Sequence, residues 1–308
     1  MDYVVFLISM AALIYGADFI IKESERVALH FNISHFVIGA TLIAFGTSLP
    51  EMAASMVASY HGKSDMAIAN VVGSVIFNIT LVLGVVFMIA KSMNPNRDLF
   101  SKDSIWVIVP VIIFYIMIQD EEISRLDGIL FLLMMVSYLF FLFSSSKEKF
   151  ESEIDEDLKK REFNWLKSAL LLLVGFIFTI GGANFVVESG TNIARSLNVD
   201  EWIVGLFLIS LGTSLPELVV SLVAIKKGNL EMSIGNIIGS NVANFSMVLG
   251  GASLINPLAI DVSATSYDIL IMISASLTLL FILANKIYNK AGGIFLLSIL
   301  VLFIAHAV

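Results

Sequence analysis

Long apolar stretches alternate with short polar ones along the whole chain. About 20 apolar residues in a helix cross a hydrocarbon core roughly 30 Å thick. The stretches lack the strict alternation of membrane-barrel strands, so helices are expected. They predict ten transmembrane helices, at residues 2–22, 36–60, 66–90, 104–119, 126–143, 166–188, 202–225, 232–257, 266–285 and 292–307. The expected fold class is an all-α membrane protein.

Basic residues gather on one side of these helices. The loops after the first, third, fifth, seventh and ninth helices, counted with Lys22 and Lys167 at the helix ends beside them, hold 15 of the 18 Lys and Arg residues. Because Lys and Arg favour the cytoplasmic side of a membrane, the central loop is expected inside and both termini outside. The expected location is the cell (inner) membrane.

Composition narrows the possible functions. Only 14% of the residues are charged and 58% are hydrophobic, against about 25% charged in an average soluble domain. The absence of cysteine excludes disulfides, cysteine zinc sites and thiol catalysis. The net charge is −8 and long basic runs are absent, so no nucleic-acid partner is expected. The first helix has no basic lead-in and no cleavage site, so it is expected to stay in the mature protein.

The second half of the chain repeats the first. At an offset of 166 residues, Gly39–Glu51 aligns with Gly205–Glu217 and nine of the thirteen positions are identical. Each half holds five predicted helices, an odd number, so the second half must enter the membrane upside down. Inverted repeats are typical of secondary transporters, with the binding site near the midplane. The predicted organisation is a first five-helix repeat at 1–143, a cytoplasmic linker loop at 144–165 and a second, inverted repeat at 166–308.

Glu51 and Glu217 are the ionisable residues that fall deepest within uncharged spans. A carboxylate there costs several kcal/mol unless it is paired, hydrated or bound to a cation, so a functional role is expected. A proline precedes each glutamate, which removes a backbone donor and breaks the helix. The carbonyls of the broken turn, such as those of Thr47 and Thr213, are then expected to line a cavity.

Hydroxyl and amide side chains recur at helical spacing around the glutamates. The spacing places Ser48, Glu51 and Ser55 on one helix face, and the same pattern recurs at Ser214, Glu217 and Ser221. On the next helix of each half the pattern is Asn70, Ser74, Asn78 and Asn236, Ser240, Asn244. Such hard oxygen ligands suit Ca²⁺ and Na⁺ rather than zinc or copper.

Polar residues also hold membrane helices together without binding anything. For Asn70 and Asn236 this packing role and a ligand role are equally compatible with the sequence. For the four deeper residues the ligand role is favoured; these are Ser74, Asn78, Ser240 and Asn244.

The duplicated Gly-Thr-Ser-Leu-Pro-Glu, each followed by Gly-Ser-x-x-x-Asn, resembles the α-repeats of the calcium/cation antiporter superfamily, in its prokaryotic sodium/calcium exchanger branch. The resemblance covers essentially the whole chain. It implies that Glu51 and Glu217 bind Ca²⁺ together with the backbone carbonyls of Thr47 and Thr213. It also implies that the first and sixth helices slide to alternate access. The implied oxygens for Na⁺, or shared by both ions, come from Ser48, Ser74, Asn78, Ser214, Ser240 and Asn244 and from the backbone of Ala44 and Ser210.

One position departs from the pattern of that branch. Sodium/calcium exchangers resemble one another in having an aspartate at the position that Asn244 occupies here. The expected site of this chain therefore has two carboxylates instead of three. One titratable group is therefore missing from the expected site, and dependence on K⁺ is less expected.

The expected function is exchange of Ca²⁺ for Na⁺ at one shared site by alternating access. An H⁺/Ca²⁺ exchanger that uses the same two glutamates is the alternative within this class. A gated cation channel is the alternative from another class, although a pore needs weak multi-ion sites rather than paired neutralising carboxylates. No catalytic constellation and no cofactor are expected, and the expected state is a monomer in the lipid bilayer.

Overall fold

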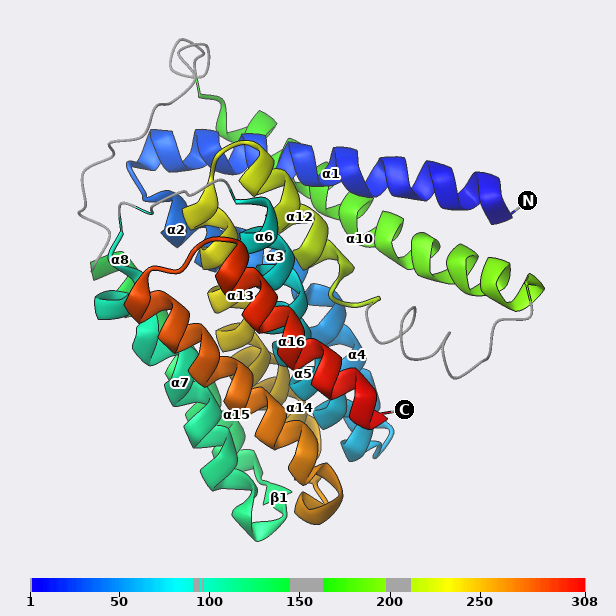
Figure 1. The fold of residues 1–308 in the computed structure, drawn as a ribbon, viewed down its shortest axis with the longest axis vertical. Helices are drawn as coiled ribbons and strands as arrows, with labels where there is room; N and C mark the ends of the chain where they lie inside the picture. The colour runs from blue at the N-terminus through cyan, green and yellow to red at the C-terminus, as the bar shows by residue number, and fades with distance from the viewer. Residues whose placement is uncertain (1, 91–94, 96, 145–162, 198–211, 308) are drawn as a thin grey trace. The chain divides into compact units, whose positions relative to one another are not determined.

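The computed structural model describes residues 2–90, 95, 97–144, 163–197 and 212–307. The regular elements among these residues are helices apart from one very short strand pair (Figure 1). The chain forms two compact units. Unit 1 comprises Met1–Thr47 and Phe141–Asn236, and unit 2 comprises Ser48–Phe140 and Ile237–Val308. Each unit therefore takes segments from both halves of the sequence.

The elements follow the predicted order with several interruptions. Those of unit 1 are α1 (Asp2–Phe31), α2 (His35–Ile38), the π-helical turn η1 (Gly39–Ile43), α3 (Ala44–Thr47), α10 (Trp165–Ser196), α12 (Leu215–Lys226) and the first half of α13 (Leu230–Ala243). In unit 2 the first-half elements are α4 (Leu49–Tyr60), α5 (Ser64–Phe77), the π-helical turn η2 (Asn78–Leu83), α6 (Gly84–Ile89), α7 (Leu99–Met117), η3 (Ile118–Asp120), β1 (Glu122–Ile123) and most of α8 (Arg125–Ser144). The second-half elements of unit 2 are the π-helical turn η5 (Asn244–Leu249), α14 (Gly250–Ile255), β2 (Leu258–Ala259), α15 (Val262–Asn285) and α16 (Lys290–Ala307).

Seven helices in the described part of the chain are long and apolar enough to cross a membrane. The helices on either side of Ser48 make an eighth if they count as one span. The last predicted span is the shorter apolar helix α16. The predicted span at 202–225 is seen only from Leu215 onward, since residues 201–211 lie outside the described part.

Two helices run beyond their predicted ends. α1 reaches Phe31 and α10 reaches Ser196, where the apolar pattern predicts ends at 22 and 188. In α1 the first added turn is polar but still packed, because Glu23 is buried and pairs with Arg26 at 2.5 Å. A prediction from hydropathy ends a span at its first charged residues, whereas in the structure tertiary contacts stabilise this helix beyond them.

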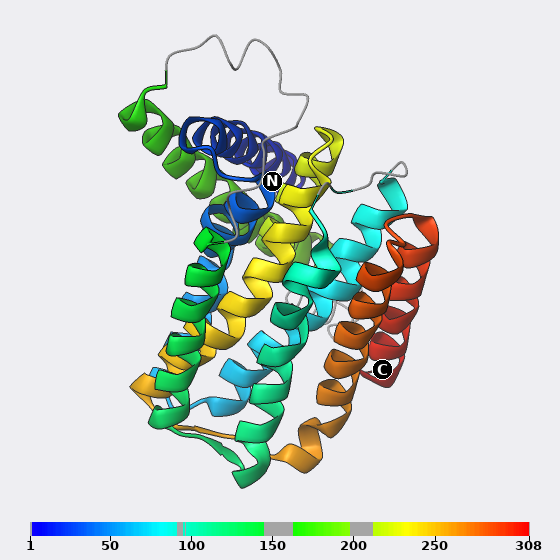
Figure 2. The same ribbon diagram turned by 90° about the vertical axis from the view of Figure 1, so that its left-hand side faces the viewer.

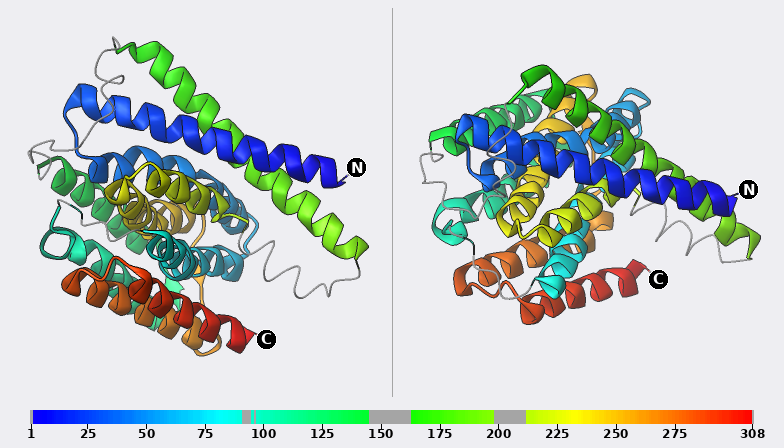
Figure 3. Two further views of the ribbon diagram at one scale, coloured as in Figure 1. Left: turned by 45° about the horizontal axis from the view of Figure 1, so that its top comes forward. Right: turned by 90° about the horizontal axis from the view of Figure 1, so that it is seen from above.

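In unit 1, α1 and α10 pack along one another in antiparallel directions (Figure 3). A Cβ on Gly16 would lie 2.6 Å from Thr179 Oγ1, and one on Gly182 would lie 2.7 Å from the backbone nitrogen of Leu13. Glycine is therefore required for this close approach. The offset of 166 converts one of these two contacts into the other, so the same packing is used twice.

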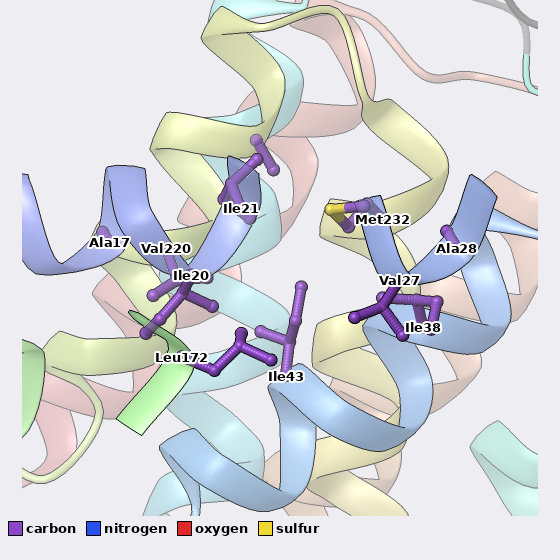
Figure 4. Close-up of a cluster of buried hydrophobic side chains, with 11 residues drawn as sticks. Ala17, Ile20, Ile21, Val27, Ala28, Ile38, Ile43, Leu172, Val220 and Met232 are labelled. Atoms are coloured by element: carbon purple, nitrogen blue, oxygen red, sulfur yellow. The ribbon is translucent and has the colours of Figure 1, made fainter. Parts of the chain in front are cut away.

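An apolar cluster fills the space between α1, α2, η1, α10, α12 and α13 of unit 1 (Figure 4). Its buried members are Ala17, Ile20, Ile21, Val27, Ala28, Ile38, Ile43, Leu172, Val220, Ala224 and Met232. The cluster holds the start of the first broken helix and the helix that carries Glu217 against α1.

In unit 2, α15 packs against α7 and α16, and α16 also packs against α6 (Figure 2). The core includes Phe245, whose ring centroid lies 5.6 Å from that of Phe114 and 6.5 Å from that of Phe131. A buried ion pair joins Arg97 to Asp103, with Nε to Oδ2 at 2.7 Å.

The strand pair was not predicted by the all-α reading. β1 and β2 pair antiparallel over two residues each, with Glu122 opposite Ala259 and Ile123 opposite Leu258. Runs this short carry no period-2 signal in a sequence, and the pairing links two loops that are far apart along the chain.

Candidate cation-binding site

The helix that carries each glutamate begins immediately after a break. α4 starts at Leu49 after Ser48 (φ −84°, ψ 5°), and α12 starts at Leu215 after Ser214 (φ −88°, ψ 0°). Proline is the second residue of each helix and has no N–H to donate to the carbonyl four residues back. The two breaks thus share one backbone conformation, as the repeated motif predicts.

Glu51 and Glu217 occupy the third position of these helices. Each is only 1% exposed. The N-terminal end of a helix stabilises a carboxylate through its unpaired N–H groups and dipole. Burial makes the charged form expensive unless it is paired or bound to a cation. Glu51 belongs to unit 2 and Glu217 to unit 1.

The end of the first half-helix is held within unit 1. The hydroxyl of Thr47, which is fully buried, lies 3.2 Å from the carbonyl oxygen of Ile43 and 3.3 Å from that of Ala44. Its single proton can be donated to either of these carbonyl oxygens. Thr213 lies in the turn that precedes α12, and Ser210 lies outside the described residues.

Unit 2 contains most of the predicted neutral ligands. The helix of Glu51, α4, packs against α5, which carries Ser74, and against η5, which begins at Asn244. Asn78 follows α5, and Ser240 lies on α13 in the same unit. All of these side chains are at most 3% exposed: Ser48, Ser74, Asn78, Ser240 and Asn244.

The helices of unit 2 change their winding at Asn78 and at Asn244. Each residue is the first of a π-helical turn, in η2 and η5 respectively. Such turns are rare and often occur at functional sites. The Oδ1 atom of each residue is buried and receives no hydrogen bond within the described part of the chain. A buried acceptor without a donor is costly, and a bound cation would satisfy it. The π-turns were not predicted, because they have no recognisable sequence signal.

Asn70 and Asn236 make equivalent contacts in the two halves. Asn70 Nδ2 donates to Ser55 Oγ at 2.9 Å and to the backbone oxygen of Glu51 at 3.2 Å. Asn236 Nδ2 donates to Ser221 Oγ at 3.1 Å. Each asparagine thus anchors the helix of its own half's glutamate, which is the packing role that the sequence analysis left open.

Asn236 has one further contact. Its Oδ1 lies 3.4 Å from the hydroxyl of Thr47, so it joins α13 to the end of α3 within unit 1. Asn236 is 1% exposed whereas Asn70 is half-buried. The same residue type is therefore more deeply enclosed in the second half.

Asp18 takes part in a structural ion pair with Lys22, four residues further along α1. It contacts Lys22 at 2.6 Å and Lys227 at 2.7 Å. The second contact ties α1 to the end of α12, and no spacing rule could reveal a partner 209 positions away.

No group of three or more His, Cys, Asp or Glu residues in the described ranges is arranged so that it could hold a metal ion. The chemistry of the region is that of isolated carboxylates among hydroxyl, amide and carbonyl oxygens. Such a set binds hard cations and offers no group suited to zinc or copper.

Known proteins resemble the chain over nearly its full length. The sodium/calcium exchanger protein family matches residues 1–144 and 167–308. An uncharacterised membrane protein of Methanocaldococcus jannaschii is 36% identical over 303 residues, covering 97% of this chain and 96% of that protein. The sodium/calcium exchanger MaX1 of Methanosarcina acetivorans is 29% identical and covers 98% and 97%. A solved structure of the sodium-calcium exchanger NCX_Mj, soaked with Na⁺ and Ca²⁺, has a TM-score of 0.83 at 32% identity and covers 99% and 97%.

Proposed function

Because the chain belongs to the sodium/calcium exchanger family, and is therefore an integral membrane transporter rather than an enzyme, we propose that it exchanges Ca²⁺ for Na⁺ by alternating access. The observation that carries this assignment is the duplicated glutamate. In each half a glutamate that is 1% exposed follows a helix break of the same conformation. A buried carboxylate at membrane depth marks an ion pathway.

Glu51 and Glu217 together bind Ca²⁺ in this scheme, with the backbone carbonyls of Thr47 and Thr213. Two carboxylates neutralise one divalent ion, which lowers the free energy of moving it through a low-dielectric core. The direction of the Thr47 hydroxyl toward other carbonyls supports a backbone role for this residue.

Na⁺ ions use the neutral oxygens around the same glutamates and compete with Ca²⁺ for the carboxylates. Since carboxylates satisfied by Na⁺ cannot also neutralise Ca²⁺, the two ions occupy the site in turn. The buried Oδ1 atoms of Asn78 and Asn244 support this assignment. The full set is Ser48, Ser74, Asn78, Ser214, Ser240 and Asn244, with the backbone oxygens of Ala44 and Ser210.

The proposed topology is ten helices in two inverted five-helix repeats, with the 144–165 loop in the cytoplasm and both termini outside. The antiparallel packing of α1 against α10, through contacts related by the repeat offset, supports inversion of the halves. In the proposed cycle α1 and α10 slide as a pair, for which a crossing made of small residues is suited.

The test is ⁴⁵Ca²⁺ uptake into proteoliposomes loaded with Na⁺, beside Na⁺-free vesicles that carry an imposed pH gradient. Uptake that requires internal Na⁺ is expected, and it would show that Asn244 is compatible with Na⁺ coupling. Uptake driven by the pH gradient alone would overturn the Na⁺ assignment and make the glutamates proton carriers. A Ca²⁺ conductance without counter-flow would overturn exchange altogether.

A further inference from the structure

Asn241 is a buried amide in unit 2 that the repeated motif does not include. It lies on α13 and is 8% exposed. Its Oδ1 accepts a hydrogen bond from Asn78 Nδ2 at 3.0 Å. The bond joins α13 to the first residue of the π-helical turn η2, and both partners belong to unit 2.

This bond decides which end of the Asn78 amide is committed to the protein. An asparagine side chain has a donor nitrogen and an acceptor oxygen. With the nitrogen of Asn78 donated to Asn241, the remaining polar atom is Oδ1. That oxygen is buried in a residue 1% exposed and receives no donor from the described residues. An amide turned the other way would present N–H groups, which repel cations.

The second half lacks an equivalent device. At the repeat offset of 166, Asn241 corresponds to Val75, and Asn78 corresponds to Asn244. Valine has no polar atom to accept a bond from Asn244. The Oδ1 of Asn244 is also buried without a donor in the described part of the chain. Only one of the two symmetric amides is thus held by a residue at this position.

Resting on the cation exchange proposed above, we propose that Asn241 is a positioning residue that fixes Asn78 with its oxygen as a cation ligand. Asn241 itself does not bind the ion. Position 78 is a preoriented neutral ligand, so cation binding there does not have to order the amide first. At position 244 the amide is oriented only when the ion binds.

The test compares two substitutions of nearly equal size at position 241. Asn241→Leu removes the acceptor, and Asn241→Asp keeps an acceptor but has no donor. The readout is equilibrium binding of ⁴⁵Ca²⁺ and ²²Na⁺ to the purified full-length protein in detergent, with the thermal unfolding midpoint as a check on folding. Asn241→Leu is expected to weaken cation binding about tenfold, as a loss of about 1.4 kcal/mol does. Asn241→Asp is expected to retain wild-type affinity or exceed it.

A double-mutant cycle with Asn78→Ala separates positioning from general packing. Because Asn241 acts through Asn78, Asn241→Leu is expected to have no further effect on binding once Asn78 is alanine. A purely structural residue would still weaken binding in that background, and such a result would overturn the inference. Wild-type affinity in Asn241→Leu, or an equal loss in Asn241→Asp, would overturn it as well.

Separate measurements of cation binding and of transport distinguish a failure of the role of Asn241 from a failure of the proposed function. If vesicle uptake proves independent of Na⁺, the exchange assignment fails, yet the pattern of Ca²⁺ affinities in the variants still tests Asn241. If uptake is Na⁺-dependent and the variants bind normally, only the role of Asn241 is wrong.

Discussion

The helix that begins at Leu49 and the helix that begins at Leu215 are nearly the same structure, yet their surroundings differ. Both follow a serine of the same backbone conformation and place a buried glutamate at the third position. Both are anchored through a serine by an asparagine of the next helix. The second anchor, Asn236, is more buried than Asn70 and also reaches Thr47.

A second difference between the halves concerns the residues that contact the two amides, Asn78 and Asn244. Asn78 is held by Asn241, whereas the residue equivalent to Asn241 beside the second amide is Val75. The proposed side-chain ligands and the Asn70 and Asn236 anchors are duplicated, whereas the contact of Asn241 with Asn78 is not. Inverted halves keep a common ligand geometry and can still diverge in how firmly each ligand is fixed.

The largest effect is expected from removing either glutamate's charge. Glu51→Gln and Glu217→Gln should each reduce Ca²⁺ transport by about 100-fold or more, because loss of one partner from a buried charge site costs roughly 3–5 kcal/mol. The measurement is initial ⁴⁵Ca²⁺ uptake in proteoliposomes. Glu122→Gln, an exposed glutamate of β1 in unit 2, is the control and should transport normally. Normal transport by both glutamate variants would contradict the assignment of Glu51 and Glu217 to the cation site.

A smaller effect is expected at the α1–α10 crossing, where two adjacent glycines form a matched pair. A Cβ on Gly182 meets Leu13 and Ser9, whereas one on Gly181 meets nothing within 4 Å. Gly182→Ala should destabilise the protein by about 1–3 kcal/mol through overpacking and slow transport. Gly181→Ala should leave both unchanged. Thermal unfolding midpoints and uptake rates measure this, and equal behaviour of the two variants would contradict the close crossing.

The asparagine anchors should differ in strength between the halves. Asn70→Leu and Asn236→Leu remove the donors to Ser55 and Ser221, and each should weaken Ca²⁺ binding several-fold, as loss of a hydrogen bond of about 1 kcal/mol does. Asn236→Leu is expected to be the more severe, since it also loses the contact with Thr47. Cycles with Ser55→Ala and Ser221→Ala should show coupling in both halves. Additive effects would mean that the anchors do not act through these serines.

The smallest effect is expected from restoring the symmetry of the amide pair. Val75→Asn offers Asn244 the acceptor that Asn78 already has, and should tighten cation binding by about two- to threefold, within the range of one hydrogen bond. Val75→Leu is the apolar control and should not tighten binding. The gain should vanish when Asn244 is replaced by alanine. Unchanged affinity in Val75→Asn would indicate that the two halves differ by more than this one residue.

The amino-acid sequence by itself determined the helical membrane class, the breaks before the two glutamates and the family. These features are local or repeated: an apolar run is long enough to span, a proline lacks its N–H, and one motif recurs at one offset. The nine identities between Gly39–Glu51 and Gly205–Glu217 can be recognised without any knowledge of the tertiary structure.

Only the tertiary structure decided how those pieces are held. The choice of Asn241 over its neighbours as the partner of Asn78, the second ion-pair partner of Asp18 and the extra turns of α1 all depend on residues distant along the chain. The π-helical turns at Asn78 and Asn244 and the pairing of β1 with β2 are of the same kind. Such contacts form because packing brings helices together in space, and sequence spacing reports only which residues share one face of one helix.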